Sequence, residues 1–338
     1  MKNWFCFYTG LLLTSILSYS CNGKAANTDT SVANQTEECL LVGNFNADSA
    51  YRYIERQVAF GPRVPGTEAH EACAEYLVSE LKRHGVDTMS VQRGTVTAFN
   101  GDVLPITNII AGFNAPARNR VLLVAHYDTR PWADNESSEQ LRNQPILGAN
   151  DGASGVGVIL EIARNLGMKR PNIGVDILFV DAEDYGDNSS FGNNSESWCL
   201  GSQYWTQNKI PYSNPDVPMP SYGILLDMVG GKNARFHYEA FSKEFAPQPT
   251  FKIWSEAQRL KHGNVFITAP GGNITDDHVF ITNAGIPTTD IIETNNEETS
   301  SFPPTWHTHN DNMSNISKST LKAVGETVLN VLYKEKAY

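Results

Sequence analysis

An apolar, strand-like run at 177–180 leads without a break into three acids, Asp181, Glu183 and Asp184. Carboxylates that a buried strand delivers to one place repel one another and lose their hydration. They stay charged there only when a cation lies among them. The pattern therefore points to a cation-binding site at the end of this strand.

Other side chains capable of chemistry follow similar segments. His126 and Asp128 end the apolar run RVLLVAHYD, Asp227 follows YGILL, and Asp151 lies in the glycine-rich turn GANDGASG before a helix-like segment. His307 lies in a late loop, FPPTWHTHND. Any single acid of this kind could simply cap a helix or lie in a solvated turn. Because strand ends of α/β sheets gather at one edge, we expect these side chains to lie together around a divalent metal.

The ligand types indicate which metal this is. Imidazole and carboxylate without thiolate suit zinc held by two or three side chains, with one position open for substrate. Asp128 is well placed to accept a hydrogen bond from the imidazole of His126. Glu183 and Asp184 are neighbours and do not easily point at one ion, so one is expected to bind it while the other transfers protons.

Strand-like and helix-like segments alternate along the chain. This pattern predicts an α/β fold with three layers, in which a mostly parallel sheet has helices on both faces. The predicted helices cover 48–60, 68–85, 153–166, 199–207, 250–263, 276–285 and 318–333, and the predicted strands cover 88–99, 105–113, 120–128, 174–184, 222–230 and 287–293. We expect Asp48 to cap the first helix, and Cys73, Trp205 and Trp254 to pack in the core. For Trp132, a pocket and a packing position are equally compatible with the sequence.

The composition indicates a folded protein that acts on small or peptide substrates. The chain has 338 residues, of which 41% are hydrophobic, and a formal net charge of -11. It contains no block of Lys or Arg that could neutralise phosphates, which argues against nucleic-acid binding.

The N-terminal segment indicates export. Residues 1–21 have one basic residue, an apolar stretch too short to span a bilayer, and Cys21 at the end, as a secretory or lipoprotein signal does. Lipidation of Cys21 is expected, and cleavage with release is the alternative. Residues 22–36 read as a polar tether and 37–338 as a single catalytic domain. We expect a monomer in the periplasm of a Gram-negative bacterium, bound to the membrane only through a lipid on Cys21.

Six ordered motifs carry a family resemblance. AHYDTRPWAD, PILGANDGASGVGVILEIA, FVDAEDYG, LLDMVGG, TDDHVFITNAGIP and FPPTWHTHND occur in that order, and the similarity extends from about residue 50 to the end. They resemble the zinc aminopeptidase fold and, within it, the glutaminyl cyclases, particularly the bacterial ones.

The resemblance implies one zinc ion, held by Asp151, Asp184 and His307. It implies that Glu183 is the general acid and base, and that Asp227 and Asp276 form a hydrogen-bonded carboxylate network beside it.

It also implies an aromatic wall next to the substrate. Trp306 and Phe302 match this wall, and Trp198 and Phe191 are candidates for the same pocket, in a segment (187–198) that is inserted relative to the animal cyclases.

Two positions depart from the animal pattern. Asp184 replaces a Glu, so the ion or the strand must shift slightly, and Asp290 replaces a His, which leaves the role of that position open.

These roles predict a cyclisation. The substrate is a peptide that begins with glutamine, and zinc polarises the oxygen of its side-chain amide. The α-amine of the same residue attacks this amide at high effective concentration. Glu183 moves the proton from the amine to the departing ammonia, and pyroglutamate is left at the N-terminus.

Two alternatives remain. A two-zinc aminopeptidase would use His126, Asp151, Asp184, Asp227 and His307 as ligands, with Glu183 activating a water. Trp306, Phe302 and the Asp-Asp-His sequence at 276–278 favour the cyclase instead. A binding lipoprotein without catalysis is also compatible with the fold, but it would have little use for an unpaired acid beside the ion.

Overall fold

A mixed sheet of six strands organises the computed structural model, which describes residues 43–189 and 194–337. The order across the sheet is β1-β2-β4-β3-β5-β8. The strands are β1 (Thr88–Thr97), β2 (Val103–Phe113), β3 (Arg120–His126), β4 (Gly174–Val180), β5 (Tyr222–Leu226) and β8 (Thr288–Ile291). β1, β2 and β4 pair antiparallel, whereas β4, β3, β5 and β8 pair parallel.

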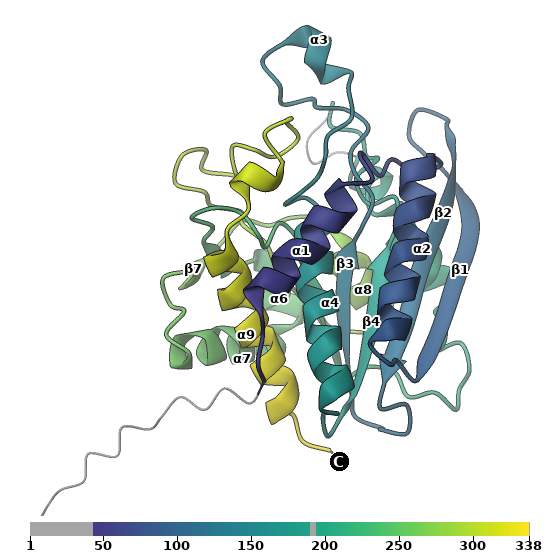
Figure 1. Cartoon of the computed structure of the whole chain (residues 1–338), viewed down its shortest axis with the longest axis vertical. Helices are drawn as coiled ribbons and strands as arrows, with labels where there is room; N and C mark the ends of the chain where they lie inside the picture. The colour runs from purple at the N-terminus through teal and green to yellow at the C-terminus, as the bar shows by residue number, and fades with distance from the viewer. Residues whose placement is uncertain (1–42, 190–193, 338) are drawn as a thin grey trace, which may run out of the picture. The chain divides into compact units, whose positions relative to one another are not determined.

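Helices cover both faces of this sheet (Figure 1). One face carries α1 (Ala47–Val58), α2 (Glu68–Arg83), α4 (Ala153–Met168), α7 (Pro247–Arg259) and α9 (Lys318–Lys334). The other carries α5 (Leu200–Gln207) and α8 (Asp277–Asn283). Shorter elements complete the chain: α3 (Glu139–Arg142), α6 (Ala240–Phe245), the 3-10 turns Ser195–Ser197 and Met313–Asn315, and a separate pair of strands, β6 (Phe236–Tyr238) and β7 (Phe266–Pro270).

Alternating side chains of the central strands feed two separate cores. Every residue of β3 and β4 is buried. In β3, Leu123 joins the core under α1, α4 and α9, while its neighbour Leu122 joins the core that contains Trp205 of α5 and Ile281 of α8. This is why these strands read as continuous apolar runs in the sequence.

The parallel register brings the strand ends together. His126 at the end of β3 lies opposite Val180 at the end of β4, and β5 and β8 lie on the other side of β3 in the same direction. Residues that directly follow these strands therefore share one edge of the sheet.

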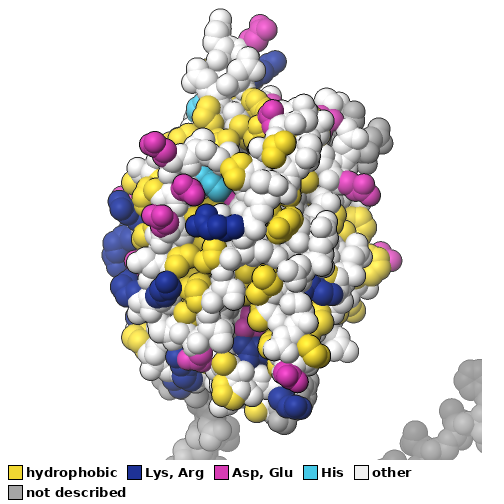
Figure 2. Space-filling model, turned by 90° about the vertical axis from the view of Figure 1, so that its right-hand side faces the viewer, with side chains coloured by type: hydrophobic (Ala, Val, Ile, Leu, Met, Phe, Trp, Pro, Cys, Tyr) yellow, Lys and Arg dark blue, Asp and Glu magenta, His cyan; other side chains and the backbone are white. Residues whose placement is uncertain are grey.

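β1 is an edge strand of this sheet. Figure 2 shows the side of the molecule on which it lies, where acidic, basic and hydrophobic side chains are interspersed. Charged side chains near an edge strand oppose pairing with another chain.

The predicted layers, helices and strands are confirmed, with small differences. Asn46, not Asp48, caps α1, because the Asn46 side chain accepts a hydrogen bond from the Ser49 amide. Cys73, Trp205 and Trp254 are fully buried, as expected. The short elements α3, α6, β6 and β7 were not predicted.

Several predictions concern the N-terminal segment. The signal segment 1–21, Cys21 and the tether 22–36 lie outside the described residues, so the domain division stays a prediction. Among the described helices, none has the length and apolar character needed to cross a membrane.

Candidate metal centre and active site

A cavity of about 410 Å³ opens at the carboxyl edge of the parallel strands. Its lining includes six acids and no Lys or Arg among the described residues. These acids are Asp151, Glu183, Asp184, Asp187, Asp227 and Asp276. Such an accumulation of carboxylates suits a cavity that receives cations.

Three side chains from distant segments form one donor group. Oδ1 of Asp184, in the loop after β4, lies 3.1 Å from Nε2 of His307. Oδ2 of Asp151, in the turn before α4, lies 3.7 Å from the same nitrogen. One ligand atom from each residue lies within 4.8 Å of the others. The structure thus brings together the three residues expected to bind zinc.

The group fits a zinc ion chemically. Asp151 Oδ2 and Asp184 Oδ2 are buried and have no hydrogen-bond partner within the described residues. Unpartnered buried carboxylate oxygens are costly unless a cation or proton compensates them. Two carboxylates and one imidazole leave a fourth position of a tetrahedral ion open for substrate.

Neighbouring carboxylates hold these candidate ligands in place. Asp311 accepts the backbone amide hydrogens of Asn150 and Asp151, at 2.7 and 3.0 Å. Asp134 Oδ1 lies 3.1 Å from Nδ1 of His307, and the pKa of Asp134 is strongly lowered: burial alone would raise it, but His307 and Arg130 outweigh this effect. Such partners orient metal ligands. Sequence reasoning missed Asp134 and Asp311, although both lie inside motifs that it had singled out.

Asp128 has more contacts than expected. Its Oδ1 lies 3.4 Å from Nδ1 of His126, as the sequence suggested. Its two oxygens also accept the backbone amide hydrogens of Glu183 and Asp184, each at 3.1 Å. Asp128 therefore fixes the turn that carries both acids.

The third acid of the opening run points elsewhere. Asp181 Oδ1 lies 2.8 Å from Nε2 of His70, and Oδ2 accepts hydrogen bonds from the Tyr127 hydroxyl at 3.0 Å and the Thr107 amide at 2.6 Å. Asp181 is thus hydrogen-bonded to other protein groups and is not among the residues that line the cavity.

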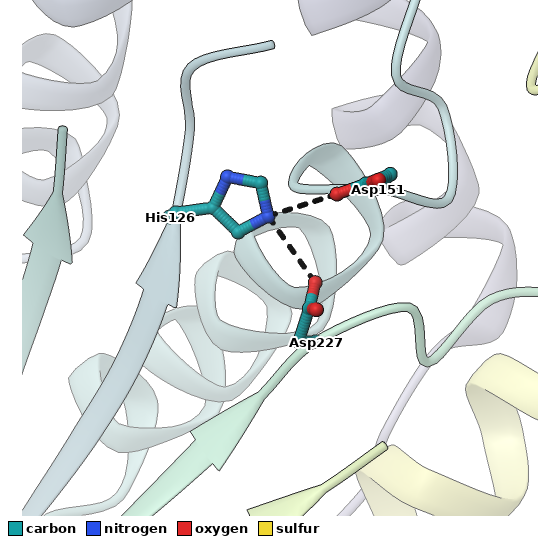
Figure 3. Close-up of side chains that lie close together, drawn as sticks. All are labelled: His126, Asp151 and Asp227. Carbon is teal, nitrogen blue, oxygen red and sulfur yellow. Dashed lines mark hydrogen bonds and ion pairs between the residues drawn. The ribbon is translucent and has the colours of Figure 1, made fainter. Parts of the chain in front are cut away.

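A second donor group shares Asp151 with the first. Nε2 of His126 lies 3.1 Å from Asp151 Oδ1 and 3.2 Å from Asp227 Oδ1 (Figure 3). Burial lowers the pKa of His126, but its contacts with Asp128, Asp151 and Asp227 prevail and raise this pKa well above its ordinary value. The geometry therefore offers donor atoms for a second cation beside the first.

Glu183 differs from the candidate zinc ligands because its carboxylate faces the cavity without a charged partner. Burial, together with the charges of Asp276, Asp184 and Asp277, raises its pKa well above the ordinary value. A raised pKa makes a carboxylate a stronger proton acceptor, as a general base requires.

Asp276 belongs to a buried chain of acids and one histidine. It caps α8 through the Asp277 amide, and burial with the charge of Asp227 raises its pKa to about 7. His278 Nδ1 lies 3.5 Å from Asp290 Oδ2, and His278 Nε2 lies 3.1 Å from Glu239 Oε2. The sequence left the role of Asp290 open. One ligand atom of Asp290 lies within 4.8 Å of one from Asp276 and one from His278, and Asp290 is not among the residues that line the cavity.

Aromatic rings surround the candidate zinc histidine. The Trp306 ring stacks on His307 at 3.8 Å and contacts Phe302 at 4.4 Å, and the Trp198 ring lies parallel to His307 at 6.1 Å. All three expected aromatic residues line the cavity. Phe191 lies outside the described residues.

Trp132 is not part of this cavity lining. It packs edge-on against Tyr185 and Phe99.

The backbone around the cavity is unusual. Ala182, Met228, Cys199 and His307 have φ angles of 50°, 50°, 57° and 55°, in the left-handed region that non-glycine residues rarely adopt. Gly152 has φ 83°, and a Cβ there would lie 2.9 Å from the His126 ring. Such strain gathers at functional sites, where it aims side chains that a relaxed backbone would turn away.

Comparisons with known proteins indicate the family of the chain. Residues 108–332 match the model of peptidase family M28. The glutaminyl cyclase of Bacteroides thetaiotaomicron bound to N-acetylhistamine is 50% identical, with a TM-score of 0.82, over 87% of this chain and 99% of that one. The Tannerella forsythia glutaminyl cyclase is also 50% identical, with a TM-score of 0.82, over 87% and 100%.

A structure described as a leucine aminopeptidase precursor from Bacteroides thetaiotaomicron is 49% identical, with a TM-score of 0.81, over 87% of this chain and 98% of that one. The family model matches more than half of this chain, and the two cyclases match over almost their whole length. The chain therefore belongs to peptidase family M28 and, within it, to the bacterial glutaminyl cyclases.

Proposed function

We propose that this protein is a glutaminyl-peptide cyclotransferase, which converts the N-terminal glutamine of peptides into pyroglutamate and releases ammonia. The observation that carries the proposal is the meeting of Glu183 with the donors Asp151, Asp184 and His307 in one cavity, in a chain half identical to glutaminyl cyclases.

Different residues of the cavity have different roles in the proposed reaction. A zinc ion bound by the three donors would supply Lewis-acid polarisation of the side-chain amide. Three aromatic residues of the cavity lining surround the substrate's glutamine side chain: Trp306, Phe302 and Trp198. Asp227 and Asp276 receive the α-amine and orient it toward the amide carbon, which raises the effective concentration of the nucleophile.

Glu183 carries the proton through the reaction. The bond between the α-nitrogen and the amide carbon forms while the bond from that carbon to the amide nitrogen breaks. Glu183 takes a proton from the attacking amine and returns it to the departing nitrogen, which leaves as ammonia. No water is consumed, and the peptide bond stays intact.

A single zinc ion is part of this proposal. The second candidate function is a two-zinc aminopeptidase, and the observation that favours it is the group His126, Asp151 and Asp227. In that enzyme Asp227 binds the second ion, and Glu183 acts on a water. The two candidate functions therefore differ both in the number of bound zinc ions and in the product formed.

Mass spectrometry of a glutamine-initiated peptide, incubated with the zinc-loaded protein, tests the proposal. Loss of ammonia with the peptide bond intact is expected. Release of free glutamine, together with two bound zinc ions, would identify the aminopeptidase. An unchanged peptide would support a binding lipoprotein without catalysis.

We also propose that the protein is exported to the periplasm and lipid-anchored at Cys21, on the basis of its N-terminal 21 residues. A monomer is a separate part of the proposal. Fatty-acid labelling of the wild type that is absent in Cys21→Ser is the expected result. Light scattering of the purified protein tests the monomer.

A further inference from the structure

The carboxylate of Glu183 has a sulfur partner. Its Oε1 accepts a hydrogen bond from Sγ of Cys199 at 3.3 Å. Within residues 43–189 and 194–337, no other hydrogen bond to this carboxylate is found, and Glu183 lines the cavity. One oxygen is thus held by the thiol, and the other has no protein partner in that part of the chain.

The backbone fixes Cys199 relative to Glu183. The Cys199 amide donates to the Glu183 carbonyl at 2.9 Å, and the Leu200 amide donates to the Ala182 carbonyl at 3.0 Å. Cys199 has a left-handed φ of 57° at the start of α5 and is fully buried. Two main-chain hydrogen bonds therefore fix the backbone of Cys199 relative to Glu183, and the surrounding packing restricts the position of its sulfur.

The chemical state of the thiol suits a hydrogen-bond donor. Burial, with the charges of Glu183, Asp277 and Asp276, raises the pKa of Cys199 well above its ordinary value. The sulfur keeps its proton, so it donates to the carboxylate and is inert as a nucleophile. A thiol is a weak donor, so this bond supplies orientation more than binding energy.

We propose that Cys199 is a positioning residue for proton transfer: its S–H group holds Oε1 of Glu183, so that Oε2 faces the substrate amine. The inference rests on the proposed cyclase function for its kinetic consequence. General acids and bases act only when they lie within hydrogen-bond reach of the proton that they move. Loss of the thiol lets the carboxylate rotate away from the amine without removing any substrate contact.

Two substitutions separate hydrogen bonding from packing. Cys199→Ala removes the donor, whereas Cys199→Ser keeps one. Neither side chain is β-branched, so neither adds the strain that Val or Thr would meet at a left-handed φ. Cys73→Ala is the matched control, because Cys73 is also a free, fully buried cysteine and lies in α2.

Steady-state kinetics on a glutamine-initiated peptide give the first readout. Cys199→Ala is expected to lower kcat by about tenfold to a hundredfold, the range in which misplaced catalytic groups act, with KM changed less than about threefold. Cys199→Ser is expected to stay within about threefold of the wild-type kcat, and Cys73→Ala to match the wild type. Wild-type kcat in Cys199→Ala would overturn the proposal, as would an equal loss in Cys199→Ser.

Infrared spectroscopy gives a readout that does not depend on the reaction or on the folding of Cys199→Ala. The difference between wild type and Cys199→Ser isolates the S–H stretching band of Cys199. Glu183→Ala is expected to shift this band, because the acceptor is gone. A band at the same position would overturn the proposal. If the wild type released free glutamine, the proposed function would fail. The S–H band would still show whether Cys199 donates a hydrogen bond to Glu183.

Discussion

Asp276→Asn is expected to stabilise the metal-free protein in a pH-dependent way. Burial and the charge of Asp227 raise the pKa of Asp276 from 3.8 to about 7. A carboxyl group whose pKa is higher in the folded chain opposes folding once the pH exceeds its unfolded pKa, and the opposition is complete above its folded pKa. At 1.36 kcal/mol per pKa unit, the shift corresponds to about 4 kcal/mol above pH 7.

The substitution keeps the other role of the side chain. Asp276 Oδ1 accepts the Asp277 amide hydrogen at the start of α8. Asn caps helices as well as Asp does, so α8 is expected to persist. The difference in stability between variant and wild type therefore reports mainly the removed charge.

Thermal unfolding in the presence of a chelator, at pH values from 4 to 9, measures this difference. We expect the two melting temperatures to agree near pH 4, to diverge between pH 4 and 7, and to differ by roughly 5–10 °C above pH 8. Asp216→Asn, at an exposed position, is the control and is expected to show no such divergence. A constant difference across the pH range, or a variant that is less stable above pH 7, would refute the electrostatic reasoning.

Three further changes test the site. Glu183→Gln is expected to lower kcat by about 10²- to 10⁴-fold with zinc retained, while Glu55→Gln, at an exposed position, has no effect; retained activity would remove Glu183 from proton transfer. Asp134→Asn is expected to weaken zinc binding by about tenfold to a hundredfold in chelator competition, since Asp134 lies 3.1 Å from the His307 imidazole. Zinc in excess of one ion is expected to inhibit cyclisation by occupying Asp227, and faster turnover would contradict this.

The edge at which the site lies was predictable from the order of strand-like runs. β3, β4 and β5 are parallel neighbours, so His126, Glu183 with Asp184, and Asp227 had to meet once the fold class was known. The family resemblance then predicted which of them bind metal. The loop that carries His307 was expected to pack nearby, but a late loop has no register that fixes its position, and only the resemblance gave His307 the role of a metal ligand.

Other features depend on contacts between distant segments. Asp181 and Glu183 are two residues apart, yet Asp181 turns toward His70, which is 111 positions earlier in the chain. Asp311 reaches the Asp151 amide across 160 positions. Local patterns contain no information about such pairs. The cap of α1 was misassigned because Asn46 and Asp48 are both good caps, and only the backbone geometry decides between them.

The two donor groups explain why residue types alone do not separate the cyclase from the aminopeptidase. Asp151 belongs to both groups, and Asp227 lines the cavity. In the proposed cyclase Asp227 faces the substrate amine, whereas in the aminopeptidase it binds a second ion. It does not do both at once, because a bound ion would occupy the oxygen and repel a cationic amine. With an ion at Asp227, the amine is held away from the amide carbon and water becomes the nucleophile. With the amine at Asp227, the nucleophile is part of the substrate. Under the proposed function, the number of bound ions would therefore select the reaction.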